Sequence, residues 1–386
     1  MNLKQRIEQD VNRIAVDIAG PNAIDVDKNA RFPTESITAL KNAQVLSASI
    51  PEHLGGAGMD IIEQGLLCQK LSQYCAATAM VLGMHFIKVS SIVHFGLGNK
   101  KFETYLKSIV EQQRLVGSVT SEEGVGGNLR TSITSVETEG ETFSLTKHSS
   151  CLSYGAYADD LLITCRKDQE SAASNQVLVL AVGDDFELEQ KGVWDSLGMR
   201  GTCSPPFSVT VHAESWKIFE HDFAHIAART MVPDTHVIWA NVWLGIATDA
   251  ARRARSLVQN KARKNPSILP DNARDLAQLE IELDRFRDTV KTVSELYLQA
   301  HNEDNKDFLF SIPFSLKINA LKLNSSQLVT EICTKAMQIC GFAGYLNNTS
   351  FSVGRHLRDA LSAAPMIGNG RIIETNATNL MVYKGK

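Results

Sequence analysis

The sequence lacks a long hydrophobic run and an excess of charge of either sign. Its longest strongly apolar stretch is VLVLAV at residues 177–182, far below the ~20 residues that a membrane-spanning helix needs. Lys and Arg total 39 and Asp and Glu total 43, so the formal net charge is -4. Nucleic-acid-binding proteins usually carry an excess of basic residues, and this sequence has no such excess. We therefore expect no membrane and no nucleic acid among its partners.

The seven cysteines include no CxxC pair. Their odd number argues against a disulfide framework in a chain of this length. Residues 1–8 (MNLKQRIE) are charged and lack the apolar core of a signal peptide. We therefore expect a cytoplasmic protein whose thiols are reduced and mostly buried.

A metal site is not expected either. His221 and His225 have the i, i+4 spacing of a zinc-binding helix. The Glu that follows the first His in such helices is absent, because Asp222 stands there. We expect no resident metal.

The length of 386 residues predicts two to three domains at roughly 150 residues each. Residues 1–115 form the first, a helical domain. Its first helix is indicated by apolar residues at three- and four-residue spacing, namely Ile7, Val11, Ile14, Ala15 and Ile18. We expect Gly20 and Pro21 to end this helix, and Pro33 to open the next one.

Residues 116–230 form the second predicted domain, which is built of strands. Short segments rich in β-branched residues alternate with Gly, Asn and Asp, at residues 116–121, 143–146, 160–165, 176–182 and 207–211. Strands at such spacing predict an antiparallel sandwich or barrel.

Residues 231–386 are helical again. Long helical patterns cover residues 237–261, 276–300 and 316–340, and long helices joined by short polar loops are typical of a four-helix bundle. The predicted fold is therefore mainly α with a central β domain: an N-terminal helical domain, an antiparallel β sandwich or barrel, and a C-terminal four-helix bundle.

Five motifs in this order resemble those of the acyl-CoA dehydrogenase superfamily. The motifs are PEHLGGAG at 51–58, GVGGN at 124–128, LGMRGT at 197–202, QICGFAGY at 338–345 and RDA at 358–360. Each string alone is weak, but five in the right order at the right separations are specific. The resemblance covers almost the whole chain, and Phe342 departs from it where the family has a glycine.

This resemblance implies FAD as the cofactor. A flavin enzyme must hold the ring with hydrogen bonds that tune N5 and the pyrimidine edge. By resemblance, Ser121 lies at the pyrimidine edge and Ser153 takes the place of a Thr that bonds N5, while Cys151 replaces a Trp beside the ring. Gly126 and Gly127 belong to the glycine loop of the cofactor site. The alternative from the residues alone is that both serines are strand hydroxyls facing water.

The resemblance also places part of the FAD site on a neighbouring subunit. Gln338 and Gly341 match residues that reach the pyrophosphate or adenine there, and Asn369 is assigned to the cofactor as well. The family's pyrophosphate-binding Arg is missing, and Lys261 or Arg263 is expected to replace it. A cofactor shared in this way implies a homodimer or homotetramer.

The general base is the main departure from the family. The resemblance implies an oxidoreductase acting on CH–CH donors, in which a Glu removes the proton α to a thioester. Of the two positions that the family uses, Ile367 occupies one and Thr235 the other. We expect His85 to act as a substitute acid or base, with His356 as a second candidate. The competing interpretation of His85 is a helix His bonded to backbone.

Three functions are compatible with this departure. The first is oxidation of an acyl thioester on CoA or an acyl carrier protein, with hydride passing to flavin N5 and electrons leaving to an electron-transfer flavoprotein or oxygen. This activity would serve extender-unit or secondary-metabolite biosynthesis. The second is a flavin monooxygenase of the same fold, and the third is a non-catalytic FAD-binding paralogue.

Two charged features receive surface interpretations. Glu122, which matches a family Glu beside the glycine loop, is expected to point to solvent. Arg252, Arg253 and Arg255 are expected to form a solvated helix face. The alternative for this face is contact with an acidic acyl carrier protein.

Overall fold

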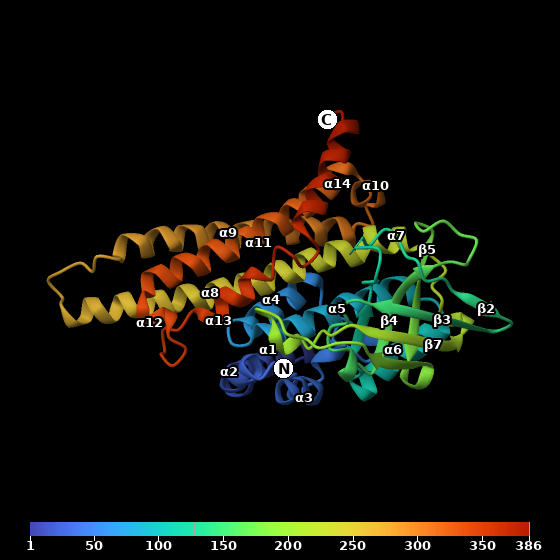
Figure 1. The fold of residues 1–386 in the computed structure, drawn as a ribbon, viewed down its shortest axis with the longest axis horizontal. Coiled ribbons are helices and arrows are strands. Elements are labelled where there is room, and N and C mark those ends of the chain that lie inside the picture. Colours follow the sequence, from blue (N-terminus) through green and yellow to red (C-terminus); the bar gives the residue numbers. More distant parts are fainter. Residues whose placement is uncertain (127, 386) are drawn as a thin grey trace.

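The computed structural model describes residues 1–126 and 128–385. Helices, a strand region and a helical bundle follow one another along the chain (Figure 1). The first helices are α1 (Leu3–Ile14), α2 (Gly20–Lys28), α3 (Thr34–Asn42), α4 (Ile61–Ser72), α5 (Ala76–Gly96) and α6 (Lys100–Gln112). The predicted stop at Gly20 and Pro21 is wrong, because a π-helical turn, Ala15–Ala19, links α1 to α2. Pro21 comes just after this π-helical turn, and the local change of hydrogen-bond register accommodates a residue that has no N–H.

The length and apolar character of helix α5 were not recognised in the sequence. Among residues 1–126 and 128–385, it is the one helix long and apolar enough to cross a membrane by length and composition. Of its most apolar window, 89% is buried inside the protein, as expected for a core helix. This single helix is therefore weak evidence for a membrane.

Two sheets form the middle region. Their strands are β1 (Val116–Val119), β2 (Glu137–Glu139), β3 (Thr142–Ser149), β4 (Asp160–Arg166), β5 (Gln176–Val182), β6 (Phe186–Gln190) and β7 (Phe207–Glu214). The first sheet has the order β1-β4-β5 and the second β2-β3-β7-β6. A shared apolar core that includes Val119, Phe143, Ile163 and Val209 joins the sheets, which makes a sandwich.

One pairing departs from the antiparallel expectation. Strand β1 runs parallel to β4, because the glycine loop, β2 and β3 lie between them and return the chain to the same end. Strands β2 and β6 were not predicted. Both are short and largely exposed. Strand β2 (ETE) has no apolar residue, whereas β6 (FELEQ) does alternate, with Phe186 and Leu188 packed against the sheet core, and this short pattern was missed.

The last region is the bundle. Its elements are α7 (Phe223–Ile226), a π-helical turn (Ala227–Met231), α8 (Val232–Lys264), α9 (Ala273–Asn302), α10 (Lys306–Leu309), α11 (Ile312–Cys340), α12 (Phe342–Tyr345), α13 (Gly354–Leu361) and α14 (Asn369–Val382). The three predicted long helices lie within α8, α9 and α11. The predicted fold class is thus confirmed.

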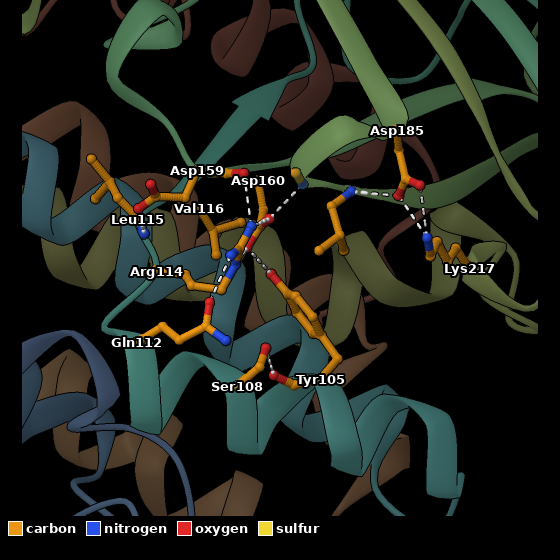
Figure 2. Close-up of polar contacts among 12 residues, drawn as sticks. Tyr105, Ser108, Gln112, Arg114, Leu115, Val116, Asp159, Asp160, Asp185 and Lys217 are labelled. Atoms are coloured by element: carbon orange, nitrogen blue, oxygen red, sulfur yellow. Dashed lines mark hydrogen bonds and ion pairs between the residues drawn. The ribbon is translucent and has the colours of Figure 1, made fainter.

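A buried carboxylate joins the helical domain to the β domain (Figure 2). Asp160, at the start of β4, is fully buried. It accepts hydrogen bonds from Tyr105 Oη at 2.9 Å and Arg114 Nε at 2.7 Å. The neighbouring Asp159 carboxylate accepts from Leu115 N and Lys41 Nζ, both at 2.7 Å. These contacts fix the start of the parallel β1–β4 pair against α6.

Two of the sequence motifs meet in space. The backbone N–H of Met199 donates to the Asp359 carboxylate at 2.7 Å, and the Arg358 guanidinium pairs with Asp27 of α2. A Cβ added at Gly198 would lie 2.0 Å from the Arg358 carbonyl oxygen. The LGMRGT motif therefore needs a glycine there so that the loop can approach the backbone of α13.

This close approach predicts the effect of Gly198→Ala. The methyl group has no space, and its overpacking should lower the free energy of unfolding by about 1–3 kcal/mol in urea denaturation. Gly370→Ala is the matched control, because its added Cβ would meet nothing within 4 Å. The explanation is wrong if both variants unfold at the wild-type urea concentration.

Candidate functional site

A row of hydroxyl groups lies on the β domain where the sequence predicted the flavin ring. Ser121 Oγ donates to the Cys151 carbonyl at 2.7 Å and lies 2.8 Å from Ser149 Oγ. Ser204 Oγ donates to Ser153 Oγ at 2.9 Å and lies 2.8 Å from Thr202 Oγ1. Ser121 and Ser153 are half-buried and take part in protein hydrogen bonds, so they differ from simple strand hydroxyls facing water.

Ser153 keeps a hydrogen to donate. A serine hydroxyl has one donor and two acceptor positions, and Ser204 uses one acceptor position of Ser153. Within the described chain, Ser153 Oγ donates to no other residue. This arrangement suits a donor to a ring nitrogen. Cys151, between the two groups, presents a smaller side chain than a tryptophan would.

Glu122 anchors the loop beside this row, and its predicted exposure to solvent is wrong. The residue is 5% exposed. Its carboxylate accepts from the Ile133 and Thr134 backbone N–H groups at 3.0 and 2.7 Å and from the Ser132 hydroxyl at 2.7 Å. The buried Lys147 ammonium lies 3.6 Å away. Burial opposes ionisation, but Lys147 and these donors outweigh it and lower the pKa of Glu122.

The glycine loop lies against α14. Gly124 and Gly126 have φ of +85° and +56°, which favour glycine. A Cβ added at Gly126 would lie 3.0 Å from an Arg371 guanidinium nitrogen. Arg371 therefore brings a cation suited to phosphate to this loop. Gly127, the other predicted loop residue, lies outside the described residues.

Four of the other predicted cofactor residues lie at the opposite end of the bundle. Lys261, Arg263, Gln338 and Gly341 are all exposed, at the ends of α8 and α11 that point away from the β domain (Figure 1). Gly341 has φ of 57° and ψ of −139°, a conformation that is essentially limited to glycine. One chain thus does not bring these residues together with Ser121 and Ser153.

A buried lysine occupies the corner where the family's carboxylate is missing. Lys322 is fully buried. Its Nζ donates to the Ile367 carbonyl at 2.8 Å and to the Asn369 side-chain oxygen. Burial lowers the pKa of Lys322 to about 8. The side chain of Asn369 therefore binds Lys322 in this structure. A role for Lys322 was not predicted from the sequence, where it is only one of several charged residues within the apolar pattern of α11.

Thr235, at the second empty position, is also engaged. It is 6% exposed, and its Oγ1 donates to the Met231 carbonyl at 2.5 Å. The two positions where the family has its catalytic Glu are thus occupied by Thr235 and Ile367, and neither side chain can act as a carboxylate base.

The two candidate histidines are bound inside the protein. His85 is fully buried, with Nε2 2.7 Å from the Leu46 carbonyl and Nδ1 accepting from the Val116 N–H at 3.0 Å. Burial lowers its pKa to about 4. His356 Nε2 lies 2.6 Å from the buried Asp249 carboxylate. The geometry matches the competing interpretation of His85, a helix His bonded to backbone, and leaves no His85 ring nitrogen for a substrate.

Comparison of the sequence with family models and with known proteins points to one family. The model described as "Acyl-CoA dehydrogenase, N-terminal domain" matches residues 3–113, and the model described as "Acyl-CoA dehydrogenase, C-terminal domain" matches residues 234–377. The chain is 21% identical over 361 residues to a short-chain-specific acyl-CoA dehydrogenase of Clostridium acetobutylicum, covering 92% of each chain.

Solved structures share the fold. Butyryl-CoA dehydrogenase of Megasphaera elsdenii matches with a TM-score of 0.80 at 19% identity, covering 99% of this chain and 98% of that one. The TdsC protein of Paenibacillus sp. A11-2, in complex with FMN and indole, matches with a TM-score of 0.83 at 16% identity. The match covers 98% of this chain and 97% of TdsC.

The anchoring of the loop by Glu122 can be tested with Glu122→Gln. Loss of the negative charge leaves Lys147 buried without its partner, so the free energy of unfolding at neutral pH should fall by about 3 kcal/mol. Because the folded pKa of Glu122 is lowered, wild type loses this contribution as the pH falls through that pKa, whereas the variant has none to lose. Denaturant melts over a pH series measure both effects.

Two further variants control this experiment. Glu123→Gln removes an adjacent exposed carboxylate and should change stability by less than about 0.5 kcal/mol. The double variant Glu122→Gln, Lys147→Met should regain part of the loss, since both charges are removed. Equal losses in Glu122→Gln and Glu123→Gln would contradict the assignment.

Proposed function

Because the chain belongs to the acyl-CoA dehydrogenase family, we propose that it is a flavin-dependent oxidoreductase that removes two electrons from an acyl thioester. Family membership confirms FAD as the predicted cofactor. The proposed substrate is carried on CoA or on an acyl carrier protein. The electrons then leave to an electron-transfer flavoprotein or to oxygen.

The hydroxyl row is the observation that carries this proposal. FAD, when bound, supplies an acceptor for a hydride at N5. Ser153 has a hydrogen available for that nitrogen, and Ser204 fixes the orientation of the Ser153 hydroxyl. Ser121, at 2.8 Å from Ser149 and 2.7 Å from the Cys151 carbonyl, is equally well held for the pyrimidine edge. Arg371 and the glycine loop provide a cation and flexible backbone for phosphate.

The separation of the predicted cofactor residues supports a homodimer or homotetramer. Gln338, Gly341 and Lys261 share the end of the bundle that points away from the β domain (Figure 1). Exposed apolar side chains lie near this end as well, with Phe342 73% and Tyr345 70% exposed. We propose that this end completes the FAD site of a second copy.

The empty carboxylate positions restrict the chemistry. Without a carboxylate at position 235 or 367, abstraction of a weakly acidic α-proton has no base of the usual kind. We therefore favour a thioester substrate whose C–H bond breaks without a strong base, such as an aldehyde hydrate, in which an oxygen lone pair drives loss of hydride. Such a substrate fits extender-unit or secondary-metabolite biosynthesis in the cytoplasm.

The same empty positions favour a second candidate. A monooxygenase that activates oxygen with reduced flavin needs no α-proton base, so Thr235 and Ile367 are equally compatible with it. A third candidate, a non-catalytic FAD-binding paralogue, would keep the cofactor contacts and lack turnover.

Anaerobic mixing separates the three candidates. FAD-loaded protein is mixed with butyryl-CoA and with 3-oxopropionyl thioesters of CoA and acyl carrier protein, whose aldehyde hydrates are the proposed hydride donors, and the flavin absorbance is followed. Loss of absorbance with a thioester supports the dehydrogenase. Reduction only by an external reductant, followed by oxygen-dependent hydroxylation, supports the monooxygenase, and no reduction by either supports the paralogue.

Ser153→Ala tests the placement of the ring. Loss of one hydrogen bond to N5 should slow reduction of the flavin by about tenfold while FAD stays bound. Thr138→Ala, on the exposed strand β2, is the matched control and should leave the rate unchanged. Equal reduction rates in Ser153→Ala and wild type would show that N5 lies elsewhere.

A further inference from the structure

A cluster of histidines surrounds one buried arginine where α5, α7, α8 and α9 meet. We define the histidine cluster as His94, His221, His225, Arg229 and His301. The ring centroids of His94 and His301 are 5.0 Å apart, and those of His221 and His225 are 5.6 Å apart. Phe95 and Phe310 pack against these rings. None of the predicted cofactor residues belongs to the cluster.

Arg229 is the centre of the cluster and has an unused donor. The residue is 4% exposed. Its Nε donates to His94 Nε2 at 2.5 Å, and one terminal nitrogen pairs with the Asp304 carboxylate. The other terminal nitrogen is buried and, within residues 1–126 and 128–385, has no hydrogen-bond partner. Nδ1 of His301 is also buried without a partner in this part of the chain. Buried polar groups are normally hydrogen-bonded, so these two atoms are free to bind a ligand that enters the cluster.

The charges of the cluster favour an anion over a metal. The described residues contain no group of three or more His, Cys, Asp or Glu side chains arranged for a metal ion, and the Arg229 cation would repel one. Lys306 adds a second cation, 3.5 Å from Asp304. Burial, together with the neighbouring cations, lowers the pKa of His94, His225 and His301. These rings are therefore neutral at pH 7. His94 keeps the lone pair on Nε2 that accepts from Arg229, whereas His225 and His301 gain a proton when an anion stabilises it.

Asp304 occupies the place where such an anion would bind. It lies in the turn between α9 and α10, its side chain is 58% exposed, and its backbone is left-handed with φ of 49°. Its carboxylate contacts both Arg229 and Lys306. An exposed carboxylate on a turn can be replaced by a stronger anion, because water solvates it when it leaves the arginine.

We propose that the histidine cluster is a binding site for a phosphate group, with Asp304 pairing with Arg229 when the phosphate is absent. The guanidinium has a planar set of donors that matches phosphate, and the unused nitrogen provides a second bond beside the one that Asp304 now receives. Nδ1 of His301, which is buried without a partner within the described residues, supplies a further ring donor. The identity of the phosphate rests on the proposed function, since CoA and the phosphopantetheine arm of carrier proteins both carry phosphate.

Titration with inorganic phosphate tests the site independently of turnover. FAD-loaded protein is titrated at constant ionic strength, and the ring signals of His94 and His301 are followed by NMR. Saturable shifts are expected in wild type, and chloride at equal ionic strength should produce none. Asp304→Asn removes the competing carboxylate and should tighten phosphate binding by about tenfold.

The matched control is Asp307→Asn, which removes one exposed negative charge from the neighbouring helix α10. If the tightening is only a change of surface charge, both variants will bind phosphate equally, and the proposal is overturned. Arg229→Lys keeps the charge but loses the planar fork, so it should weaken binding and keep the fold. Absence of saturable shifts in both wild type and Asp304→Asn also overturns the proposal.

Competition identifies the source of the phosphate. CoA, 3′-dephospho-CoA and 4′-phosphopantetheine are added to the phosphate-saturated Asp304→Asn variant. Displacement by CoA alone assigns the 3′-phosphate, and displacement by all three assigns the phosphate next to pantetheine. If inorganic phosphate binds and none of the three displaces it, the anion site stands and the thioester carrier assigned to it is wrong.

The pH dependence provides a second readout. The groups that face one another are His94 on α5, His221, Asp222, His225 and Arg229 on the segment leading into α8, His301 and Asp304 on α9 and its turn, and Lys306 on α10. Sulfate, whose charge stays constant between pH 8 and 6, serves as the probe here and should bind more tightly as the pH falls, because His225 and His301 gain protons beside the bound anion. Tighter binding at higher pH would contradict a site in which histidines supply the charge.

Discussion

The distance between the two ends of the helical bundle determines which predicted cofactor residues can meet within one chain. Helix α8 has 33 residues, which at 1.5 Å per residue spans about 50 Å. It starts beside the β domain and ends at Lys264, so Lys261 lies in its last turn, near the end of α11. Because α8 packs along α11 over this length, Gln338 and Gly341 cannot approach Ser121 or Ser153 of the same chain. A dinucleotide that contacts both groups must lie between two copies.

Buried charges hold the β domain at one end of this rod. Asp160 fixes the start of β4 through Arg114 and Tyr105, and Glu122 fixes the loop after β1 through Lys147 and three neighbouring residues. Each carboxylate is almost fully enclosed, so its hydrogen bonds must be complete for the fold to tolerate the charge. Ser121 lies just after β1 and bonds Ser149 at the end of β3, and Ser204 bonds Ser153, so both predicted flavin-binding hydroxyl groups have defined positions.

The sequence predicted the elements with regular patterns and missed those without one. The long helices and the five apolar strands were found because their spacing repeats. Strand β2 is short and polar, and β6 has only two apolar residues in its alternating pattern, Phe186 and Leu188. Five motifs located the family, yet the burial of Glu122 could not be foreseen, because its partner Lys147 comes from another strand. The partners of His85, Leu46 and Val116, are distant in sequence and could not be foreseen. The spacing of His221 and His225 was visible in the sequence, but the approach of His94 and Asp304 to Arg229 was not.

Complementation between two defective chains tests the shared FAD site most directly. Gly126→Val damages the loop on the β domain, and Gly341→Val damages the far end of the bundle, so each variant alone should lose FAD. When the two are co-expressed with different tags and the mixed dimer is isolated, one intact site should form from one half of each chain. We expect about one FAD for every two chains. A mixed dimer without FAD, or FAD bound by isolated single chains, would contradict the account.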